Sequence, residues 1–276
     1  ERDGVRVIML PGPPREVRPL LEHRVRPILA ELSDAVIASH NVHFYGIGES
    51  EMEYRLRGYM EELTNPTLAP YAKSGECLVR VTAKARTAEE AEEMMAPVIE
   101  RVKAMFGDLV YAVDGKDIAE HTVKLLIEKG VTIAAAESCT GGSIAARFTA
   151  MPGASAYFLC GVVAYSNESK NNLLGVDPET IASRGAVSEE VARQMAEGAR
   201  RITGADYAVA TTGIAGPAGG TEQKPVGTVW MAVAGPHRTV TLLKQCGTDR
   251  GQVIDRASAF ALALLRDEIE RDAAGE

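Results

Sequence analysis

The sequence predicts an α/β fold preceded by a smaller α+β domain. Three observations support this prediction. Along residues 116–276, apolar runs typical of buried strands alternate with helical stretches, as in α/β proteins. Residues 35–113 give the order βαββαβ, which is typical of a small α+β sandwich. Hydrophobic residues make up 46% and charged residues 25% of the chain, a composition that favours a packed core over disorder.

Residues 1–34 form the first block. We predict a strand at Val5–Leu10, a turn at the PGPP motif and an amphipathic helix from about Glu16 to Leu32. A block this short cannot bury a core of its own. We therefore expect it to be a packed extension or the end of a domain that precedes these residues.

Residues 35–113 form the second block. The predicted elements, in order, are a strand at Val42–Ile47, a helix from about Ser50, strands at Leu68–Tyr71 and Leu78–Ala85, a helix at Ala88–Phe106 and a strand at Val110–Val113. Ser50 with Glu53, and Thr87 with Glu90, have the spacing of helix capping boxes. These patterns predict two well-delimited helices against an antiparallel sheet.

A linker at 114–116 precedes the third block, residues 116–276. We predict helices near 117–129, 141–150, 188–203 and 250–271, and strands at 131–136, 158–165, 206–211, 226–234 and 239–244. The last two strands are separated by Gly235-Pro236-His237, which predicts an antiparallel hairpin.

The bulk composition excludes several classes of protein. A net charge of −8 argues against a general nucleic-acid binder, which needs a cationic surface. None of the four cysteines forms a CxxC pair, so neither a zinc site nor a redox pair is indicated. No apolar run approaches the roughly 20 residues of a membrane span, and no signal peptide is visible. We expect a cytoplasmic enzyme with reduced thiols and no membrane partner.

The motif Glu-Ser-Cys-Thr-Gly-Gly at residues 137–142 lies between a predicted strand and a predicted helix. Such turns are where α/β folds place nucleophiles and bind anions. Ser138 and Cys139 are adjacent candidate nucleophiles. Backbone amides freed by Gly141 and Gly142 could stabilise an oxyanion or hold a phosphate. The same spacing also allows a plain tight turn with a capping Ser or Thr.

A serine nucleophile needs a base, and no histidine stands out for that role. His40 and His43 form HxxH, but on a strand their side chains point to opposite faces, which argues against a metal site. Lys170 is the better candidate because it falls near the start of a helix capped by Ser166 or Asn167. The helix dipole disfavours an ammonium there. A solvated surface lysine is the alternative.

Tyr165 precedes Lys170 by five residues. Short-chain dehydrogenases carry a tyrosine and a lysine four residues apart on one helix face, whereas Tyr165 falls at the end of a predicted strand. No Gly-x-Gly-x-x-Gly follows a first strand either. We therefore reject a dehydrogenase.

The glycine-rich segment TTGIAGPAGG, residues 211–220, directly follows a predicted strand. Glycines let the backbone approach a ligand closely, and α/β sheets bind ligands at this end of their strands. An ordinary long turn is the alternative, and a Walker loop is excluded because no GK[ST] follows. Farther on, Asp249 is a natural N-cap. Arg250 follows it, although the N-terminal end of a helix favours anions over cations. This position is explained if Arg250 faces an anionic ligand; the alternative is a surface arginine paired with a nearby carboxylate.

Four long motifs, occurring in this order, resemble the CinA family: ESCTGGSIAARFT, PGASAYFLCGVVAYSNESKNNLLGV, GAVSEEVARQMAEGAR and DYAVATTGIAGPAGGTEQKPVGTVW. More narrowly, residues 116–276 resemble its C-terminal nicotinamide-nucleotide amidase domain of the PncC type. Residues 35–113 resemble the KH-like linking domain of the family. LPGPPREVRPLLE resembles the end of its molybdopterin-binding-like N-terminal domain, so 1–34 is expected to be the tail of a truncated copy. The resemblance implies a three-layer α/β/α amidase domain preceded by a small α+β KH-like domain.

The resemblance also implies a reaction, the hydrolysis of nicotinamide mononucleotide (NMN) to nicotinate mononucleotide and ammonia, without metal or organic cofactor. It implies Ser138 as nucleophile, Lys170 as base and Tyr165 as a supporting catalytic residue. The substrate is expected to contact Ser155, Thr140, Gly141, Thr212, Gly213 and Arg250. The partner is then a small pyridine nucleotide, and a homodimer is expected.

Competing interpretations remain. Cys139 is a rival nucleophile, because a helix N-terminus lowers the pKa of a thiol. In a different class, the chain is a non-catalytic nucleotide-binding or scaffold module. RNA binding by residues 35–113 is disfavoured, because this segment has no GxxG loop and carries 12 acidic against 8 basic side chains.

Overall fold

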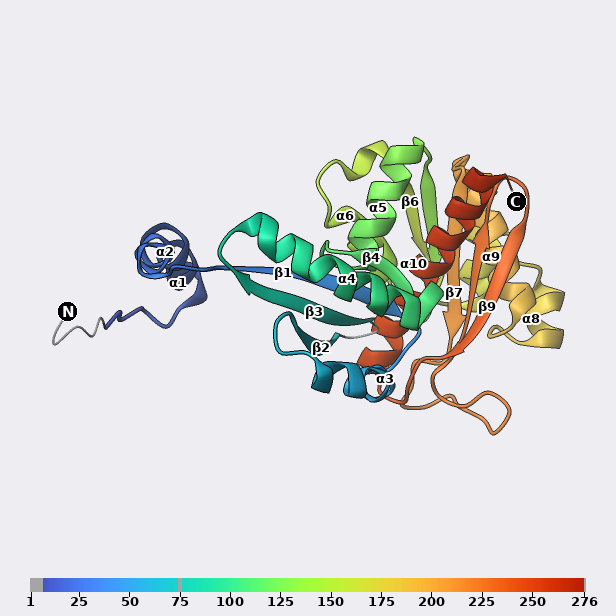
Figure 1. Cartoon of the computed structure of the whole chain (residues 1–276). Helices are drawn as coiled ribbons and strands as arrows, with labels where there is room; N and C mark the ends of the chain where they lie inside the picture. Colours follow the sequence, from blue (N-terminus) through green and yellow to red (C-terminus); the bar gives the residue numbers. More distant parts are fainter. Residues whose placement is uncertain (1–6, 74–75, 276) are drawn as a thin grey trace.

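The computed structural model describes residues 7–73 and 76–275. They form two sheets, one of four strands and one of five, each with its own helices (Figure 1). An α+β domain holds the first sheet and an α/β domain the second. The predicted fold class is confirmed.

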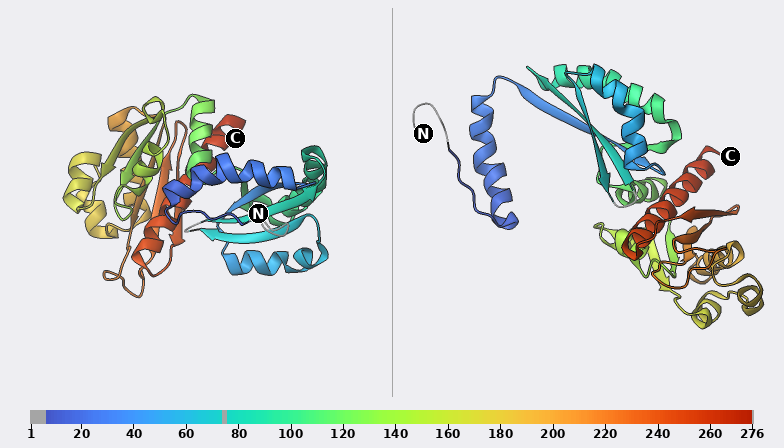
Figure 2. Two further views of the ribbon diagram at one scale, coloured as in Figure 1. Left: turned by 90° about the vertical axis from the view of Figure 1, so that its left-hand side faces the viewer. Right: turned by 90° about the horizontal axis from the view of Figure 1, so that it is seen from below.

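The N-terminal segment contains a helical run that contacts little else. It consists of α1 (Pro14–Leu20), a π-helical turn (Leu21–Val25) and α2 (Arg26–Leu32). Only Val25 in this run is buried, and Figure 2 shows the run standing off from the sheet of the α+β domain. The strand predicted at Val5–Leu10 is wrong for Val7–Leu10, since a strand needs a hydrogen-bonded neighbour and none is adjacent. Residues 5 and 6 lie outside the described residues.

The α+β domain has the predicted order βαββαβ. Its elements are β1 (Val36–Tyr45), α3 (Glu49–Glu62), β2 (Thr67–Lys73), β3 (Glu76–Ala85), α4 (Ala88–Phe106) and β4 (Val110–Val113). The sheet order is β2-β3-β1-β4, and all pairs are antiparallel. Apolar side chains from the sheet and from both helices form one core between them.

Two local predictions in this domain have different outcomes. The Thr87 hydroxyl accepts a hydrogen bond from the Glu90 N–H and caps α4 as expected. The predicted cap at Ser50 is wrong, because α3 begins at Glu49 after Gly48 and no side chain caps it. Strand β1 also begins six residues earlier than predicted. Residues 36–41 are exposed or half-buried, and their pairing with β3 places them in the strand.

The α/β domain follows the linker. Its elements are α5 (Ile118–Lys129), β5 (Ile133–Glu137), α6 (Ser143–Thr149), β6 (Phe158–Val163), α7 (Asn167–Leu174), α8 (Pro178–Arg184), α9 (Glu189–Thr203), β7 (Tyr207–Gly213), β8 (Thr228–Ala234), β9 (Thr239–Gln245) and α10 (Arg250–Ala274). The sheet order is β6-β5-β7-β8-β9. Strands β5, β6 and β7 are parallel, and β8 and β9 form the predicted hairpin.

Helices cover both faces of this sheet, which gives the expected three layers (Figure 1). Helices α5, α6 and α10 pack over one core, and α9 with α7 packs over the other. β5 is flanked by β6 on one side and β7 on the other. The strands that follow β5 in the chain are thus added on opposite sides of it, which makes its carboxyl end a topological switch point. The carboxyl ends of strands at such a switch point are where α/β folds bind ligands.

Buried contacts join the two domains. The Glu76 carboxylate of β3 accepts hydrogen bonds from the Tyr111 hydroxyl and from the Ile118 N–H at the start of α5. Burial raises the pKa of Glu76 above its ordinary value. The Tyr45 hydroxyl donates to Asp267 of α10 at 3.1 Å. The start of the α/β domain is therefore anchored on the sheet of the α+β domain.

Candidate active site

Six of the nine predicted site residues line a cavity of about 280 Å³ beyond the carboxyl ends of β5, β6 and β7. This volume is just below the roughly 300–1,000 Å³ of typical small-molecule sites. It therefore suits a small molecule or one end of a larger one. The lining comprises Ser138, Cys139, Tyr165, Asn167, Lys170, Ala186, Val187, Thr212, Gly213, Ile214, Ala215, Gly216, Ala218, Gly219 and Arg250.

Ser138 is held at the cavity by the turn that follows β5. Its N–H donates to the Thr211 carbonyl at 3.0 Å, which extends the pairing of β5 with β7 by one residue. Gly141 and Gly142 then adopt positive φ angles of 61° and 99°, a conformation that side chains rarely allow. The chain can thus turn sharply into α6, with Ser138 at the bend.

Glu137, the last residue of β5, stabilises this turn through hydrogen bonds to its carboxylate. Its side chain is buried, and its carboxylate accepts hydrogen bonds from the N–H groups of Gly142, Ile144 and Ala145 at 2.8–3.1 Å. These donors are the amides that a helix N-terminus leaves without partners. Glu137 therefore serves as the cap of α6.

This cap overturns one prediction from the sequence. The amides at the start of α6 are occupied by Glu137, so they are not free to hold a phosphate or an oxyanion. The Gly141 N–H is also used, by the Ser138 carbonyl. Within the turn as described, the backbone N–H groups of Cys139 and Thr140 donate to no other residue. These two amides directly follow Ser138 in the chain.

Lys170 meets Ser138 directly. Its Nζ lies 3.0 Å from Ser138 Oγ, 3.0 Å from the Ala164 carbonyl oxygen and 3.3 Å from that of Tyr165. A neutral amine has two N–H donors and one lone pair. The two carbonyls can take the donors, which leaves the lone pair for the serine hydroxyl. An ammonium would find all three contacts satisfied as well.

The surroundings of Lys170 favour its neutral form. The side chain is 2% exposed, and burial lowers the pKa of its ammonium below the ordinary value of 10.5. Lys170 also lies in the first turns of α7, whose cap is Ser166, and the helix dipole disfavours a cation there. In the part of the chain that the structure describes, no carboxylate is hydrogen-bonded to its Nζ.

Cys139 lines the same cavity but is poorly suited to be the nucleophile. The residue is 5% exposed, and burial raises the pKa of its thiol to about 12. The thiolate, rather than the thiol, is the reactive form. The geometry thus favours Ser138 over Cys139.

Tyr165 and Arg250 both line the cavity and are hydrogen-bonded to each other, although they come from different elements. Tyr165 follows β6, and Arg250 is the first residue of α10, whose N-cap is Asp249 as predicted. Arg250 donates to the Tyr165 hydroxyl at 3.0 Å and to the Gly216 carbonyl at 2.9 Å. Neither partner is a carboxylate, so this guanidinium keeps its charge available to an anion.

The glycine-rich segment after β7 forms another wall of the cavity. The Thr212 hydroxyl donates to the Ala186 carbonyl at 2.7 Å. Gly213 leaves no space for a side chain, because an added Cβ would lie 2.6 Å from a Val229 methyl group and 2.8 Å from the Thr228 carbonyl oxygen. Glycine at 213 therefore lets β7 continue against β8 while its backbone faces the cavity.

Three predicted contact residues do not line the cavity. Ser155 lies in the 3-10 turn Ala154–Ala156, at the end of β6 opposite to Tyr165. The Thr140 hydroxyl is buried against that of Thr211, 2.7 Å away, and Gly141 serves the turn. The structure of this chain therefore brings together Ser138, Lys170, Tyr165, Thr212, Gly213 and Arg250.

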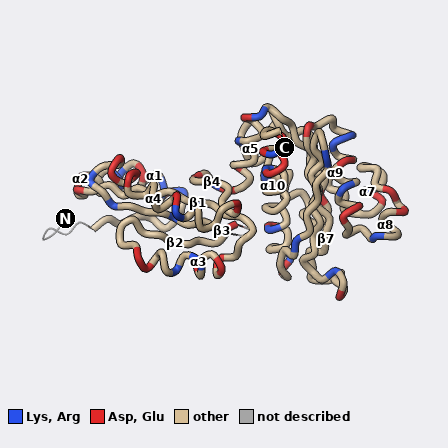
Figure 3. The backbone as a smooth tube through the Cα atoms, turned by 45° about the vertical axis from the view of Figure 1, so that its right-hand side comes forward, with Lys and Arg blue, Asp and Glu red and all other residues tan. Residues whose placement is uncertain are grey.

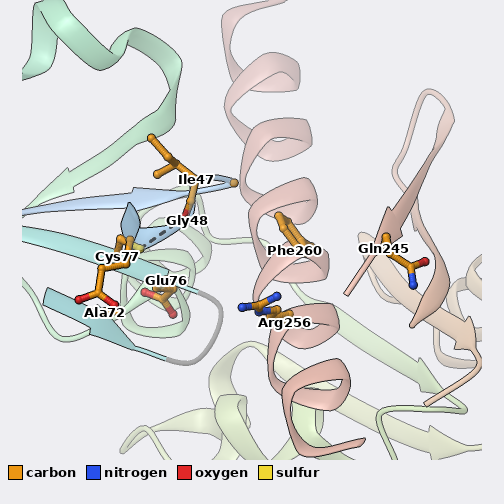
Figure 4. Close-up of a pocket in the computed structure, with 10 residues that line it drawn as sticks. Ile47, Gly48, Ala72, Glu76, Cys77, Gln245, Arg256 and Phe260 are labelled. Carbon is orange, nitrogen blue, oxygen red and sulfur yellow. Dashed lines mark hydrogen bonds between the residues drawn. The ribbon is translucent and has the colours of Figure 1, made fainter. Parts of the chain in front are cut away.

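A second cavity, of about 260 Å³, lies between the two domains (Figure 4). Arg256 and Phe260 of α10 and Gln245 of β9 face Cys77 and Glu76 across it. The Cys77 thiol donates to the Ile47 carbonyl, and burial raises its pKa. This cavity offers no nucleophile paired with a base.

Other classes of site find no support in the described residues. Residues 7–73 and 76–275 contain no cluster of three or more metal-ligating side chains. Basic and acidic residues are interspersed along the backbone of the α+β domain (Figure 3). None of the helices in those ranges is long and apolar enough to span a bilayer.

Comparison with known proteins places both domains in one family. The model of the CinA C-terminal domain matches residues 115–269. The model of the damage-inducible protein CinA KH domain matches residues 39–112. The chain belongs to the CinA family. The family resemblance seen in the sequence is confirmed.

Individual relatives agree with this assignment. A CinA-like protein of Kosmotoga olearia is 42% identical over 266 residues, which cover 96% of this chain and 65% of the relative. A CinA-like protein of Desulfovibrio desulfuricans is 46% identical, with 96% of this chain and 63% of the relative covered. The chain thus spans less than two thirds of the length of these CinA relatives.

Solved structures match the α/β domain. A CinA superfamily protein from Klebsiella pneumoniae has a TM-score of 0.54 and 37% identity, over 56% of this chain and 96% of that protein. The competence/damage-inducible protein of Agrobacterium tumefaciens has a TM-score of 0.53 and 37% identity, over 58% and 99%. The fold of the CinA C-terminal domain is therefore well represented among known structures.

Proposed function

We propose that this CinA-family chain hydrolyses the carboxamide of NMN to nicotinate mononucleotide and ammonia, using a Ser138–Lys170 dyad. The observation that carries the proposal is the 3.0 Å contact between Lys170 Nζ and Ser138 Oγ. A hydroxyl is a weak nucleophile until a base removes its proton, and a buried lysine with a lowered pKa is such a base.

The reaction follows from this contact in two halves. In the first, Ser138 Oγ attacks the carboxamide carbon and its proton moves to Lys170 Nζ. The resulting ammonium then protonates the departing nitrogen, which leaves as ammonia and creates an ester on Ser138. In the second half, water attacks the ester while Lys170 takes its proton. Lys170 returns this proton to Ser138 Oγ as the ester bond breaks, and the carboxylic acid that is released gives its own proton to water or ammonia and becomes the carboxylate.

The remaining groups of the cavity fit the other needs of this reaction. The tetrahedral intermediate carries an oxyanion, and we assign its stabilisation to the N–H groups of Cys139 and Thr140, which follow Ser138 and donate to no other described backbone group. The substrate also carries a phosphate. Within the described residues, the guanidinium of Arg250 is hydrogen-bonded to the Gly216 carbonyl and the Tyr165 hydroxyl and to no carboxylate. We therefore assign phosphate recognition to Arg250.

The test is direct measurement of the reaction with purified full chain and NMN. Ammonia release and formation of nicotinate mononucleotide are followed together, for the wild type, Ser138→Ala and Cys139→Ala. We expect Ser138→Ala to lower kcat by about 10³-fold or more. Cys139→Ala should keep most of the activity. The reverse pattern would make Cys139 the nucleophile and overturn the dyad.

A non-catalytic module would give a different result. In that case the wild type would form no product at micromolar enzyme concentration, whereas bound NMN would still raise its melting temperature. Such a result would reject the amidase and favour a nucleotide-binding scaffold. Formation of product that requires Ser138 would reject the scaffold.

A further inference from the structure

Two distant segments of the chain form neighbouring parts of the cavity lining. One is the turn between α8 and α9, which contributes Ala186 and Val187. The other is the connection between β7 and β8, which contributes Ile214–Gly216, Ala218 and Gly219. The proposed substrate lies among these residues, so the spacing of the two segments sets the shape of the site.

All four carbonyl groups of residues 184–187 are engaged by side chains. Lys224 Nζ donates to the Arg184 carbonyl at 3.0 Å and to the Val187 carbonyl at 2.7 Å. The Ala186 carbonyl accepts from the Thr212 hydroxyl at 2.7 Å, and the Gly185 carbonyl from the Ser188 hydroxyl at 2.9 Å. Three of the four bonds therefore come from β7 and the connection that follows it.

The position of Lys224 suits a fixed cation. Arg184 is the last residue of α8, so its carbonyl belongs to the negative end of that helix. Lys224 is half-buried, and in the described residues its ammonium is hydrogen-bonded to these two main-chain carbonyls and to no carboxylate. These two hydrogen bonds hold the Lys224 side chain in place and connect its segment to the turn between α8 and α9.

The loop that carries Lys224 is folded back on itself. The Thr221 N–H donates to the Lys224 carbonyl at 2.9 Å, and the Lys224 N–H donates to the Thr221 hydroxyl at 3.0 Å. An added Cβ at Gly216 would lie 2.6 Å from a Val226 methyl group, and one at Gly220 would lie 2.8 Å from the Val226 nitrogen. The cavity-lining Gly216 and the nearby Gly220 are thus packed on Val226, two residues after Lys224.

We propose that Lys224 is a positioning residue that holds the 214–226 connection against the 184–187 turn and so keeps the substrate cavity closed on that side. The proposal rests on the proposed function of this cavity. Lys224 does not line the cavity and touches neither Ser138 nor Lys170. Its loss should therefore weaken substrate binding and leave the chemical step nearly unchanged.

The test compares Lys224→Met, Lys224→Arg and the control Lys129→Met in the full chain. Methionine keeps the aliphatic stem and removes the ammonium, while arginine restores a cation that can reach the same carbonyls. Lys129 is a lysine at the end of α5, outside this cavity. For each protein, kcat and KM for NMN are measured, together with hydrogen exchange of the amides in 185–188 and 214–226.

We expect Lys224→Met to raise KM about tenfold, with kcat within about threefold of the wild type, and to speed exchange in both segments by about tenfold or more. This KM shift corresponds to about 1.4 kcal/mol. Lys224→Arg should recover most of the wild-type KM, and Lys129→Met should match the wild type throughout.

Several results would overturn the proposal. They are an unchanged KM, a loss confined to kcat, or unchanged exchange in Lys224→Met. If the wild type turns over no NMN, the proposed function fails, and exchange alone then decides whether Lys224 holds the two segments together. Faster exchange in both segments, with a melting temperature near that of the wild type, would support that role. Unchanged exchange would reject it.

Discussion

Lys170 Nζ and Ser138 Oγ are 3.0 Å apart, although their residues are 32 positions apart in the chain. Ser138 directly follows β5, and Lys170 lies in the helix that follows the neighbouring parallel strand β6. Parallel strands present their carboxyl ends at the same edge of a sheet, so both side chains reach one point. The following predictions start from this contact and from the groups around it.

The activity should rise with pH as Lys170 loses its proton. Burial lowers the pKa of its ammonium below 10.5, so the neutral base is present at lower pH than for an exposed lysine. We expect kcat/KM for NMN to fall as the pH drops through this lowered pKa, with the midpoint of the acid limb below 10.5. The measurement is a pH–rate profile from pH 5 to 10. Circular dichroism at each pH serves as the control for unfolding, and a rate that decreases steadily from pH 6 to 9 would contradict the prediction.

Glu137→Gln should loosen the turn that holds Ser138. A glutamine has one acceptor oxygen, and its NH₂ group would face N–H donors that the carboxylate now satisfies. We expect a loss of about 1–3 kcal/mol in the free energy of unfolding, with a lower kcat. Urea unfolding and steady-state kinetics measure the two effects.

Asp117→Asn is the matched control for Glu137→Gln. Asp117 caps α5 through the Glu120 N–H at 3.0 Å, and asparagine caps helices about as well as aspartate. This variant should keep wild-type stability and activity. If Glu137→Gln behaved in the same way, the carboxylate would have no special role in the turn.

Arg250→Gln should affect substrates according to their phosphate. Hydrogen bonds to charged groups contribute about 1.5–3 kcal/mol, so kcat/KM for NMN should fall by about 10–150-fold. Nicotinamide riboside, which lacks the phosphate, should lose no more than about threefold. Arg256→Gln changes an arginine on the same helix that lines the other cavity, so it should leave both substrates unaffected. An equal loss for the two substrates would assign Arg250 a role other than phosphate binding.

His40 should make stability depend on pH. Its Nδ1 is hydrogen-bonded to Asp114 of the linker, and its Nε2 is hydrogen-bonded to Glu92 of α4. These two carboxylates raise the pKa of the imidazole above 6.5. The stabilisation is fully present below pH 6.5 and is lost as the pH rises through the higher pKa of the folded state. We expect the wild type to melt about 2–4 °C above His40→Gln at pH 6, with the difference shrinking toward pH 9. Melting temperatures of both proteins across this range provide the test, and a difference that grows with pH would be the wrong sign.

Local patterns predicted most of the strands and helices, whereas the pairing of Ser138 with Lys170 was implied by the family resemblance and stays a proposal as a catalytic dyad. Apolar runs mark β5, β6 and β7, and the residues that follow their ends must share one edge of the sheet. The role of Glu137 could not be predicted, because it depends on how the backbone turns at Gly141 and Gly142. One signal was available, namely a carboxylate at the end of an otherwise apolar strand.

Other features were not predicted correctly from the sequence, each for a different reason. Helix α8 was not predicted, although Asp177 followed by Pro178 is typical of a helix start. The hydrogen bonds of Lys224 join segments about 40 residues apart, so no local pattern indicates them. Ser155 was assigned from family resemblance alone, and in this chain it lies away from the cavity. The expected homodimer stays a prediction.

The absence of an acid beside Lys170 has a consequence for the charge of the site during turnover. None of the residues that line the cavity in the described chain is acidic. In the proposed reaction, Lys170 accepts the serine proton and becomes a cation that no acidic group of the lining neutralises. The oxyanion of the tetrahedral intermediate forms in the same step and supplies the counter-ion, and both charges disappear when the intermediate collapses. A carboxylate in the lining would compete for the Lys170 ammonium and repel this oxyanion, so an acid-free lining favours the intermediate.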